Sequence, residues 1–130
     1  MRVVITGGAG FLGKLLAEKI LERGALTDAT GQLREVSELV LVDMAPAQGD
    51  PWIEDKRVSQ VIGDVADRNV LAQALTANTG SVFHLAAVVS GQAEADFDIG
   101  MRVNVDATRA LLELTRTLPA PPKFVFTSSI

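Results

Sequence analysis

The sequence predicts an α/β fold in which a parallel β-sheet carries helices on both faces. Short apolar runs rich in β-branched residues alternate along the chain with longer segments of helical periodicity. A glycine-rich turn follows the first apolar run directly. Hydrophobic residues make up 48% of the chain and aromatic residues only 5%, so we expect a core of Val, Leu, Ile and Ala, as in buried parallel sheets.

Five segments have the pattern of buried strands. Each is short, almost continuously apolar and bounded by turn-forming residues. The expected strands are Arg2–Thr6, Leu39–Val42, Val58–Ile62, Ser81–Leu85 and Lys123–Thr127. Because helical segments separate them, these strands predict βαβ units with right-handed crossovers, and therefore a parallel sheet.

Helical periodicity is expected between these strands. The apolar positions are Leu12, Leu15, Leu16 and Ile20 in the first helix, and Val70, Leu71, Ala74 and Leu75 in a second helix that begins after Asp67. The longest helix is expected from Ala95 to Leu118, where a run of prolines ends it. The segment Gly24–Ser37 is less regular and predicts a polar extension.

Composition and charge exclude several classes of function. The net charge of −4, without a visible basic face, argues against nucleic-acid binding. The chain has no Cys and one His, so we expect neither disulfides nor a metal site. No apolar run approaches the roughly 20 residues of a membrane helix, and the first run is too short for a signal peptide. We expect one soluble, cytoplasmic domain over residues 1–130.

The turn after the first strand predicts a function. Its sequence, TGGAGFLG, spans residues 6–13 and contains both G-x-G-x-x-G and G-x-x-G-x-x-G. A pyrophosphate needs close access to backbone N–H groups at a helix N-terminus, which glycines allow. A tight turn without a ligand is the alternative, but the flanking strand and helix favour a Rossmann-type doubly wound sheet that binds a dinucleotide. The expected contacts are Gly7, Gly10, Phe11, Leu12 and Gly13.

Two carboxylates follow the next strands. Asp43 ends the second strand, where a carboxylate accepts hydrogen bonds from both ribose hydroxyls and repels a 2′-phosphate. This position favours NAD over NADP, although a solvated strand end is the alternative. Asp64 follows the third strand, where it is either an adenine contact or a turn-capping residue.

With these residues, the chain resembles the extended short-chain dehydrogenase/reductases, the NAD-dependent epimerase/dehydratase family, over essentially its whole length. TGGAGFLG is similar to the opening fingerprint of that family, LVLVD to its ribose-binding strand end and GDV to its adenine contact. The resemblance implies that Asp64 contacts the adenine and that Val65 supplies backbone beside it.

Two further motifs carry the resemblance. HLAA, at residues 84–87, resembles the fourth-strand motif, which implies that Leu85, Ala86 and Ala87 line the cofactor site; core packing is the alternative for the alanines. We expect His84 to be a hydrogen-bonded structural residue rather than a catalytic one. NVDAT, at 104–108, resembles the N-V-x-G-T helix with Ala in place of Gly, which implies that Asn104 helps to hold the active site together.

The last resemblance concerns catalysis. TSS, at 127–129, resembles the segment that closes the fifth strand, which implies that Thr127 and Ser128 adjoin the cofactor and that Ser129 binds the substrate hydroxyl; turn formation is the alternative. The family also needs a Tyr-x-x-x-Lys motif, and this sequence contains no Tyr. We therefore expect the N-terminal part of a longer enzyme that is inactive alone.

The segments HLAAVVSG and ADFD are most similar to D-erythronate dehydrogenase-type members of the family. The implied function is NAD-dependent oxidation of a secondary alcohol of a sugar acid or sugar derivative. Two alternatives stay open: a nucleotide-sugar 4-epimerase or dehydratase with tightly bound NAD, and a non-catalytic NAD-binding module. The expected partners are a small sugar substrate and a second copy of the protein in a homodimer.

Overall fold

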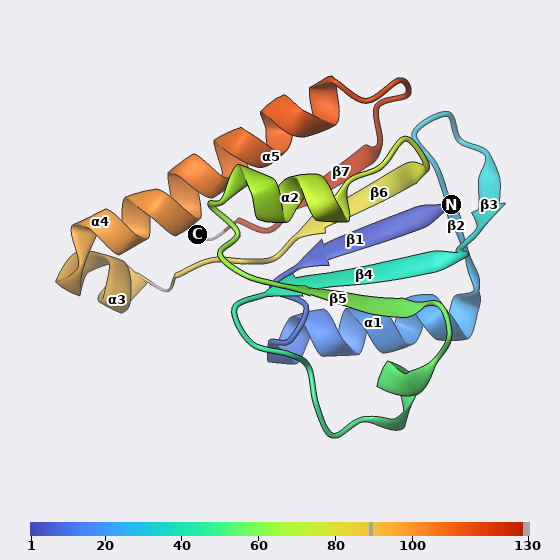
Figure 1. Cartoon of the computed structure of the whole chain (residues 1–130), viewed down its shortest axis with the longest axis horizontal. Coiled ribbons are helices and arrows are strands. Elements are labelled where there is room, and N and C mark those ends of the chain that lie inside the picture. Colours follow the sequence, from blue (N-terminus) through green and yellow to red (C-terminus); the bar gives the residue numbers. More distant parts are fainter. Residues whose placement is uncertain (89, 129–130) are drawn as a thin grey trace.

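The computed structural model describes residues 1–88 and 90–128 and shows a five-stranded sheet between two layers of helices (Figure 1). The sheet strands are β1 (Arg2–Thr6), β4 (Glu38–Asp43), β5 (Val58–Ile62), β6 (Thr79–His84) and β7 (Lys123–Phe126). Their order is β5-β4-β1-β6-β7, and every neighbouring pair is parallel. The strand order reverses at β1, so the predicted Rossmann arrangement with a central first strand is confirmed.

Helices cover the sheet on both faces. Helix α1 (Phe11–Arg23) lies on one face, and helices α2 (Arg68–Ala74) and α5 (Ala107–Arg116) lie on the other (Figure 1). Alternation along β1 serves both layers, because Val3 and Ile5 belong to the core with α1 whereas Val4 belongs to the core with α2 and α5. The short 3-10 helix η1 (Pro51–Glu54) adds Trp52 and Ile53 to the α1 side. These two cores fix the ends of the strands relative to one another.

The long helix expected from Ala95 to Leu118 is confirmed in its main part, because helical conformation runs without a break from Phe97 to Arg116. The segment forms α3 (Ser90–Ala95), α4 (Phe97–Gly100), the π-helix η2 (Met101–Asp106) and then α5. Asp96 has extended backbone, and its carboxylate accepts the Ile99 N–H, which starts a new helix. At the junction with α5, the Ala107 N–H bonds the Arg102 carbonyl five residues back, as in a π-helix. Within the described ranges, no helix has the length and apolar character that a membrane crossing requires.

The extension expected from Gly24 to Ser37 contains a hairpin that the sequence pattern did not reveal. Strands β2 (Ala25–Thr27) and β3 (Leu33–Glu35) pair antiparallel. Asp28 organises the turn, because its Oδ1 accepts the Thr30 N–H, the Thr30 hydroxyl and the Gln32 N–H. The hairpin adjoins the amino ends of the sheet strands, away from the glycine-rich turn (Figure 1).

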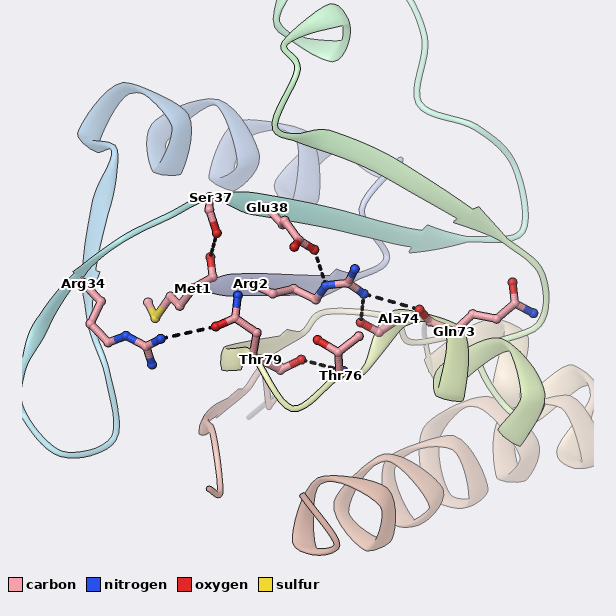
Figure 2. A network of polar contacts seen from close by, with 10 residues as sticks. Met1, Arg2, Arg34, Ser37, Glu38, Gln73, Ala74, Thr76 and Thr79 are labelled. Carbon is pink, nitrogen blue, oxygen red and sulfur yellow. Dashed lines mark hydrogen bonds and ion pairs between the residues drawn. The ribbon is translucent and has the colours of Figure 1, made fainter. Parts of the chain in front are cut away.

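Polar contacts tie neighbouring elements together at the amino ends of the strands (Figure 2). The Arg2 Nε lies 2.6 Å from Glu38 Oε2 of β4, and its Nη1 donates to the carbonyl of Ala74, the last residue of α2, at 2.8 Å. The Met1 amine donates to the Glu35 carbonyl of β3 at 2.5 Å, and the Ser37 hydroxyl donates to the Met1 carbonyl at 3.3 Å. At this end of the sheet, the polar groups therefore bond to one another.

Candidate functional site

A cavity of about 500 Å³ lies at the carboxyl ends of β1, β4, β5 and β6. It adjoins the point where the strand order reverses, which is where doubly wound sheets bind their ligands, and its size suits a small-molecule site. The structure brings together eight of the predicted contact residues in its lining: Gly7, Gly10, Asp43, Asp64, Val65, Leu85, Ala86 and Ala87.

Strand register explains why residues so distant in sequence meet there. Thr6, the last residue of β1, is aligned with Val42 of β4 on one side and with His84 of β6 on the other. The residues that follow these three positions therefore emerge side by side at one edge. Because all three strands are parallel, this edge holds the glycine turn, Asp43 and the segment that begins at Leu85.

Glycines are required in the turn because backbone passes close to backbone. Gly7 has a φ of 70°, and a Cβ added there would lie 2.9 Å from the Ala86 nitrogen. A Cβ on Gly13 would overlap the Gly7 carbonyl oxygen, although Gly13 itself does not line the cavity. Gly8, which belongs only to the overlapping G-x-G-x-x-G spacing, is buried against Leu41 of β4. Gly7 and Gly10 therefore line the cavity, whereas Gly8 and Gly13 are needed for close packing within the turn.

The N-terminus of α1 carries no compensating side chain. Gly10 is its N-cap and makes no side-chain cap hydrogen bond, and the first turn of the helix contains no acidic residue. Phe11 and Leu12 are exposed, and their side chains lie outside the cavity lining, so only their backbone N–H groups can serve the site. First-turn N–H groups and the helix dipole favour a bound anion, and a pyrophosphate fits this requirement.

Asp43 joins the strand end to the glycine turn. Its Oδ2 accepts the Ala9 N–H at 3.0 Å, and its Oδ1 accepts the Met44 N–H at 2.8 Å. A carboxylate offers about four acceptor positions, so both oxygens keep capacity for ribose hydroxyls.

Asp64 makes the contacts of a turn residue as well as lining the cavity. Its Oδ1 accepts the Ala66 N–H at 2.8 Å, and its Oδ2 forms an ion pair with Arg102 of η2. Arg102, together with Ile99 and Val103, forms a cavity wall that the sequence reasoning missed. No local signal could reveal Arg102, because its partner Asp64 lies far from it in the sequence and only the fold brings the two side chains into contact.

Asn104 shapes the cavity without lining it. Its Oδ1 accepts the Val88 N–H at 2.8 Å, and its Nδ2 donates to the Val88 carbonyl at 3.0 Å. Val88 does line the cavity, in the segment that follows β6. The part-buried amide therefore has the partners that the sequence analysis required, and it holds that segment in place.

His84 is hydrogen-bonded through both ring nitrogens, as expected for a structural residue. Its Nδ1 lies 2.6 Å from the Thr6 hydroxyl and its Nε2 lies 2.8 Å from the Thr108 hydroxyl. The side chain is buried, and burial lowers the pKa of the imidazole below its usual value. Its ring does not reach the cavity lining.

The segment assigned to catalysis is only partly described. The Thr127 N–H and hydroxyl both donate to the His84 carbonyl, at 3.4 and 3.3 Å. Thr127 and Ser128 are exposed and do not line the cavity, whereas Ser129 lies outside the described residues. Their expected roles therefore remain predictions.

Known proteins are similar to this chain in sequence and in fold. The model of the NAD dependent epimerase/dehydratase family matches residues 3–130. D-erythronate dehydrogenase of Cupriavidus necator is 56% identical over the whole chain and 39% of its own length, and that of Haemophilus influenzae is 35% identical over the whole chain and 38% of its length. A nucleoside-diphosphate-sugar epimerase from Agrobacterium tumefaciens superposes with a TM-score of 0.84 at 33% identity, over 100% of this chain and 37% of that one. The chain thus spans less than half the length of each of these proteins.

Proposed function

Because the chain belongs to the NAD dependent epimerase/dehydratase family, we propose that its cavity binds NAD and that the whole protein oxidises a secondary alcohol of a sugar acid. The observation that carries the proposal is the convergence of an uncapped helix N-terminus, a glycine turn and the Asp43 carboxylate on one cavity. The identity of 56% to a D-erythronate dehydrogenase makes D-erythronate the first substrate to test.

The residues present fit the parts of this dinucleotide. The N–H groups at the start of α1 suit the pyrophosphate, and Gly10 leaves room for it to approach. Asp43 suits the adenosine ribose, and its charge disfavours a 2′-phosphate, so we assign NAD rather than NADP. Asp64 and Val65 line the part of the cavity that we assign to the adenine.

The small side chains after β6 suit the remainder of the cofactor. Ala86 and Ala87 line the cavity and leave their backbone accessible, so the cofactor can pass close to the chain. Bound NAD supplies the acceptor for the hydride that leaves the alcohol carbon. We assign Ser129 to the hydrogen bond that orients the reacting hydroxyl, by its match to the family motif. The proton acceptor of the family is a Tyr, and these 130 residues contain none.

A second candidate is a nucleotide-sugar epimerase that keeps its NAD bound throughout turnover. The likeness to the Agrobacterium tumefaciens epimerase favours it, although at 33% identity rather than 56%. The two activities differ in their net redox change. A dehydrogenase releases NADH, whereas an epimerase converts its sugar without net reduction of NAD.

The test separates binding from turnover. Calorimetric titration of the 130-residue chain with NAD should show binding at one site, while the same chain should form no NADH from D-erythronate. General acid–base transfer contributes about 10²–10⁴-fold in rate, and its expected Tyr is absent from this sequence. The whole protein should form NADH from D-erythronate. If the chain did not bind NAD, the assignment of NAD as the cofactor would be wrong. If the 130-residue chain formed NADH, the proposed need for the Tyr would be wrong.

A further inference from the structure

His84 is placed between two elements that shape the cavity. It ends β6, is 1% exposed and is the chain's single histidine. The groups that face its ring are the hydroxyls of Thr6 on β1 and Thr108 on α5, and the rings of Phe124 and Phe126 on β7. The ring thus bridges β1 and α5 through hydrogen bonds inside an otherwise apolar setting.

The hydrogen bonds of Thr108 bear on which ring nitrogen of His84 is protonated. A hydroxyl has one hydrogen to donate, and that of Thr108 goes to the Asn104 carbonyl at 3.0 Å. Towards His84 the Thr108 oxygen can therefore only accept. If the Thr108 hydroxyl keeps its bond to Asn104, the Nε2 of His84 is the donor in the 2.8 Å contact.

The hydrogen bonds of Thr6 require the same assignment on the other side. A neutral imidazole with its proton on Nε2 has an accepting Nδ1, so the Thr6 hydroxyl donates to it. The Thr6 oxygen in turn accepts the Ala86 N–H at 3.2 Å. With the opposite tautomer, the hydrogen of this fully buried hydroxyl would lose the acceptor that the structure offers it, and a buried donor without an acceptor is destabilising.

The resulting chain of hydrogen bonds reaches the cavity lining directly at Ala86 and indirectly, through Asn104, at Val88. From the Ala86 N–H it runs through Thr6, His84 and Thr108 to the Asn104 carbonyl. Ala86 lines the cavity, and the Asn104 side chain holds Val88, which also lines it. The backbone on both sides of Ala87 is therefore connected to the imidazole.

We propose that His84, as the neutral Nε2–H tautomer, is a positioning residue that fixes the Leu85–Val88 wall of the NAD site without touching the cofactor. This inference rests on the proposed function. Protonation of Nδ1 removes the acceptor of the Thr6 hydroxyl, so the arrangement needs a ring that stays neutral. Burial, which lowers the pKa of His84, keeps the ring neutral at neutral pH.

The tautomer can be tested without any cofactor. Because the chain has one histidine, a ¹⁵N-labelled sample gives a single pair of imidazole signals. We expect a pyridine-like Nδ1 and a pyrrole-like, protonated Nε2, unchanged until the pH falls below the ordinary value of about 6.5. A protonated Nδ1, a rapidly exchanging mixture or an ordinary titration would overturn the assignment.

The positioning role is tested by a matched pair at Thr6, which is fully buried. Thr6→Val keeps the shape and removes the hydroxyl, whereas Thr6→Ser keeps the hydroxyl. Each lost hydrogen bond contributes about 0.5–1.5 kcal/mol, so we expect Thr6→Val to weaken NAD binding roughly tenfold and Thr6→Ser to bind within about twofold of the unaltered chain. A purely structural role would lower the melting temperature of Thr6→Val and leave its NAD affinity unchanged.

A second pair covers the case in which Thr6→Val does not fold. Thr108 lies on α5 and is only part-buried, so Thr108→Val and Thr108→Ser test the other half of the chain of hydrogen bonds with the same readouts. Equal NAD affinity in Thr108→Val and Thr108→Ser would overturn the role of His84. Failure of the unaltered chain to bind NAD would instead overturn the proposed function, and the role of His84 in it, while the tautomer would still stand on the NMR result.

Discussion

The amino ends and the carboxyl ends of the sheet strands differ in what their polar groups bond to. At the amino ends, Arg2 bonds both Glu38 and the last carbonyl of α2 (Figure 2). The Met1 amine also bonds the Glu35 carbonyl. At the carboxyl ends, the first turn of α1 has no capping side chain, and the Asp43 carboxylate keeps acceptor capacity. One end therefore stabilises the fold with its own contacts, and the other keeps donors and acceptors available for a ligand.

The difference begins in the side chains at each end. Long charged residues such as Arg2 and Arg34 reach across the amino ends and fill the space between elements. At the carboxyl ends, Gly7, Gly10 and Ala86 have little or no side chain, and the space above them is the cavity. Substitutions at the amino ends should therefore change stability, and substitutions at the carboxyl ends should change NAD affinity.

The largest effect is expected from Gly10→Val. A valine side chain would stand where the pyrophosphate approaches, so the charge-assisted hydrogen bonds to the turn would be lost. At about 1.5–3 kcal/mol for each such bond, NAD affinity should fall roughly 100-fold or more. Gly10 is exposed and its φ is −74°, so the fold should persist.

Calorimetry with NAD and circular dichroism of the same samples measure these two effects. Gly91→Ala is the matched control, because a Cβ there would meet open space and Gly91 does not line the cavity. A folded Gly10→Val variant with unchanged affinity would place the phosphate site elsewhere.

A smaller effect is expected from Asp43→Ala. Loss of the ribose acceptor should weaken NAD binding about tenfold, and loss of the negative charge should narrow the preference for NAD over NADP. Parallel titrations with both cofactors measure the two changes. Asp43→Asn keeps an acceptor and removes the charge, so it separates the two causes. Equal or tighter binding of NADP by the unaltered chain would contradict the assignment of Asp43.

The first test at the opposite end is Arg2→Met, which keeps the length of the side chain. The variant loses the ion pair with Glu38 and the hydrogen bond to the Ala74 carbonyl. Since Arg2 is partly screened by solvent, we expect the free energy of unfolding to fall by about 1–2 kcal/mol, with NAD affinity within about twofold. Urea unfolding, in a double-mutant cycle with Glu38→Gln, measures how much of the lost free energy of unfolding comes from the ion pair. A large loss of NAD affinity would show that the two ends are not independent.

The smallest effect is expected from Asp55→Asn near the start of β5. Arg57 donates to the Asp55 carboxylate from its backbone N–H, Nε and Nη2, which holds the pKa of Asp55 well below its usual range. A lowered pKa stabilises the fold fully above the ordinary Asp value of about 3.9, and this stabilisation is lost progressively as the pH falls from that value towards the lower pKa of the folded state. The variant should therefore be less stable at neutral pH, by under about 1 kcal/mol for so accessible a pair, with the difference shrinking in acid. Urea unfolding at about pH 7 and about pH 3 checks this; a constant difference would contradict it.

The sequence predicts best those features that depend on neighbours along the chain. The expected sheet strands all exist, with ends within two residues of those observed, and the glycine turn lies where its flanking strand and helix placed it. The helix expected from Ala95 to Leu118 exists from Phe97 to Arg116, but its apolar spacing did not reveal the π-helical segment Met101–Asp106. The pairing of Arg102 with Asp64 and the bonds of Asn104 to Val88 depend on the packed fold, so the sequence could show that Asn104 needs partners but not which ones.

In the π-helical segment Met101–Asp106, the number of residues, as well as their identity, determines which side chains face the cavity. Each residue of an α-helix turns the chain by about 100°, so removing one residue from the wide turn would swing everything before it around the helix axis. Arg102 and Ile99 would then leave the cavity, although α5 could keep its buried face on the sheet. Insertions and deletions in this segment would therefore remodel the cofactor pocket more than most single substitutions, and family members that differ here in length should differ in the shape of that wall.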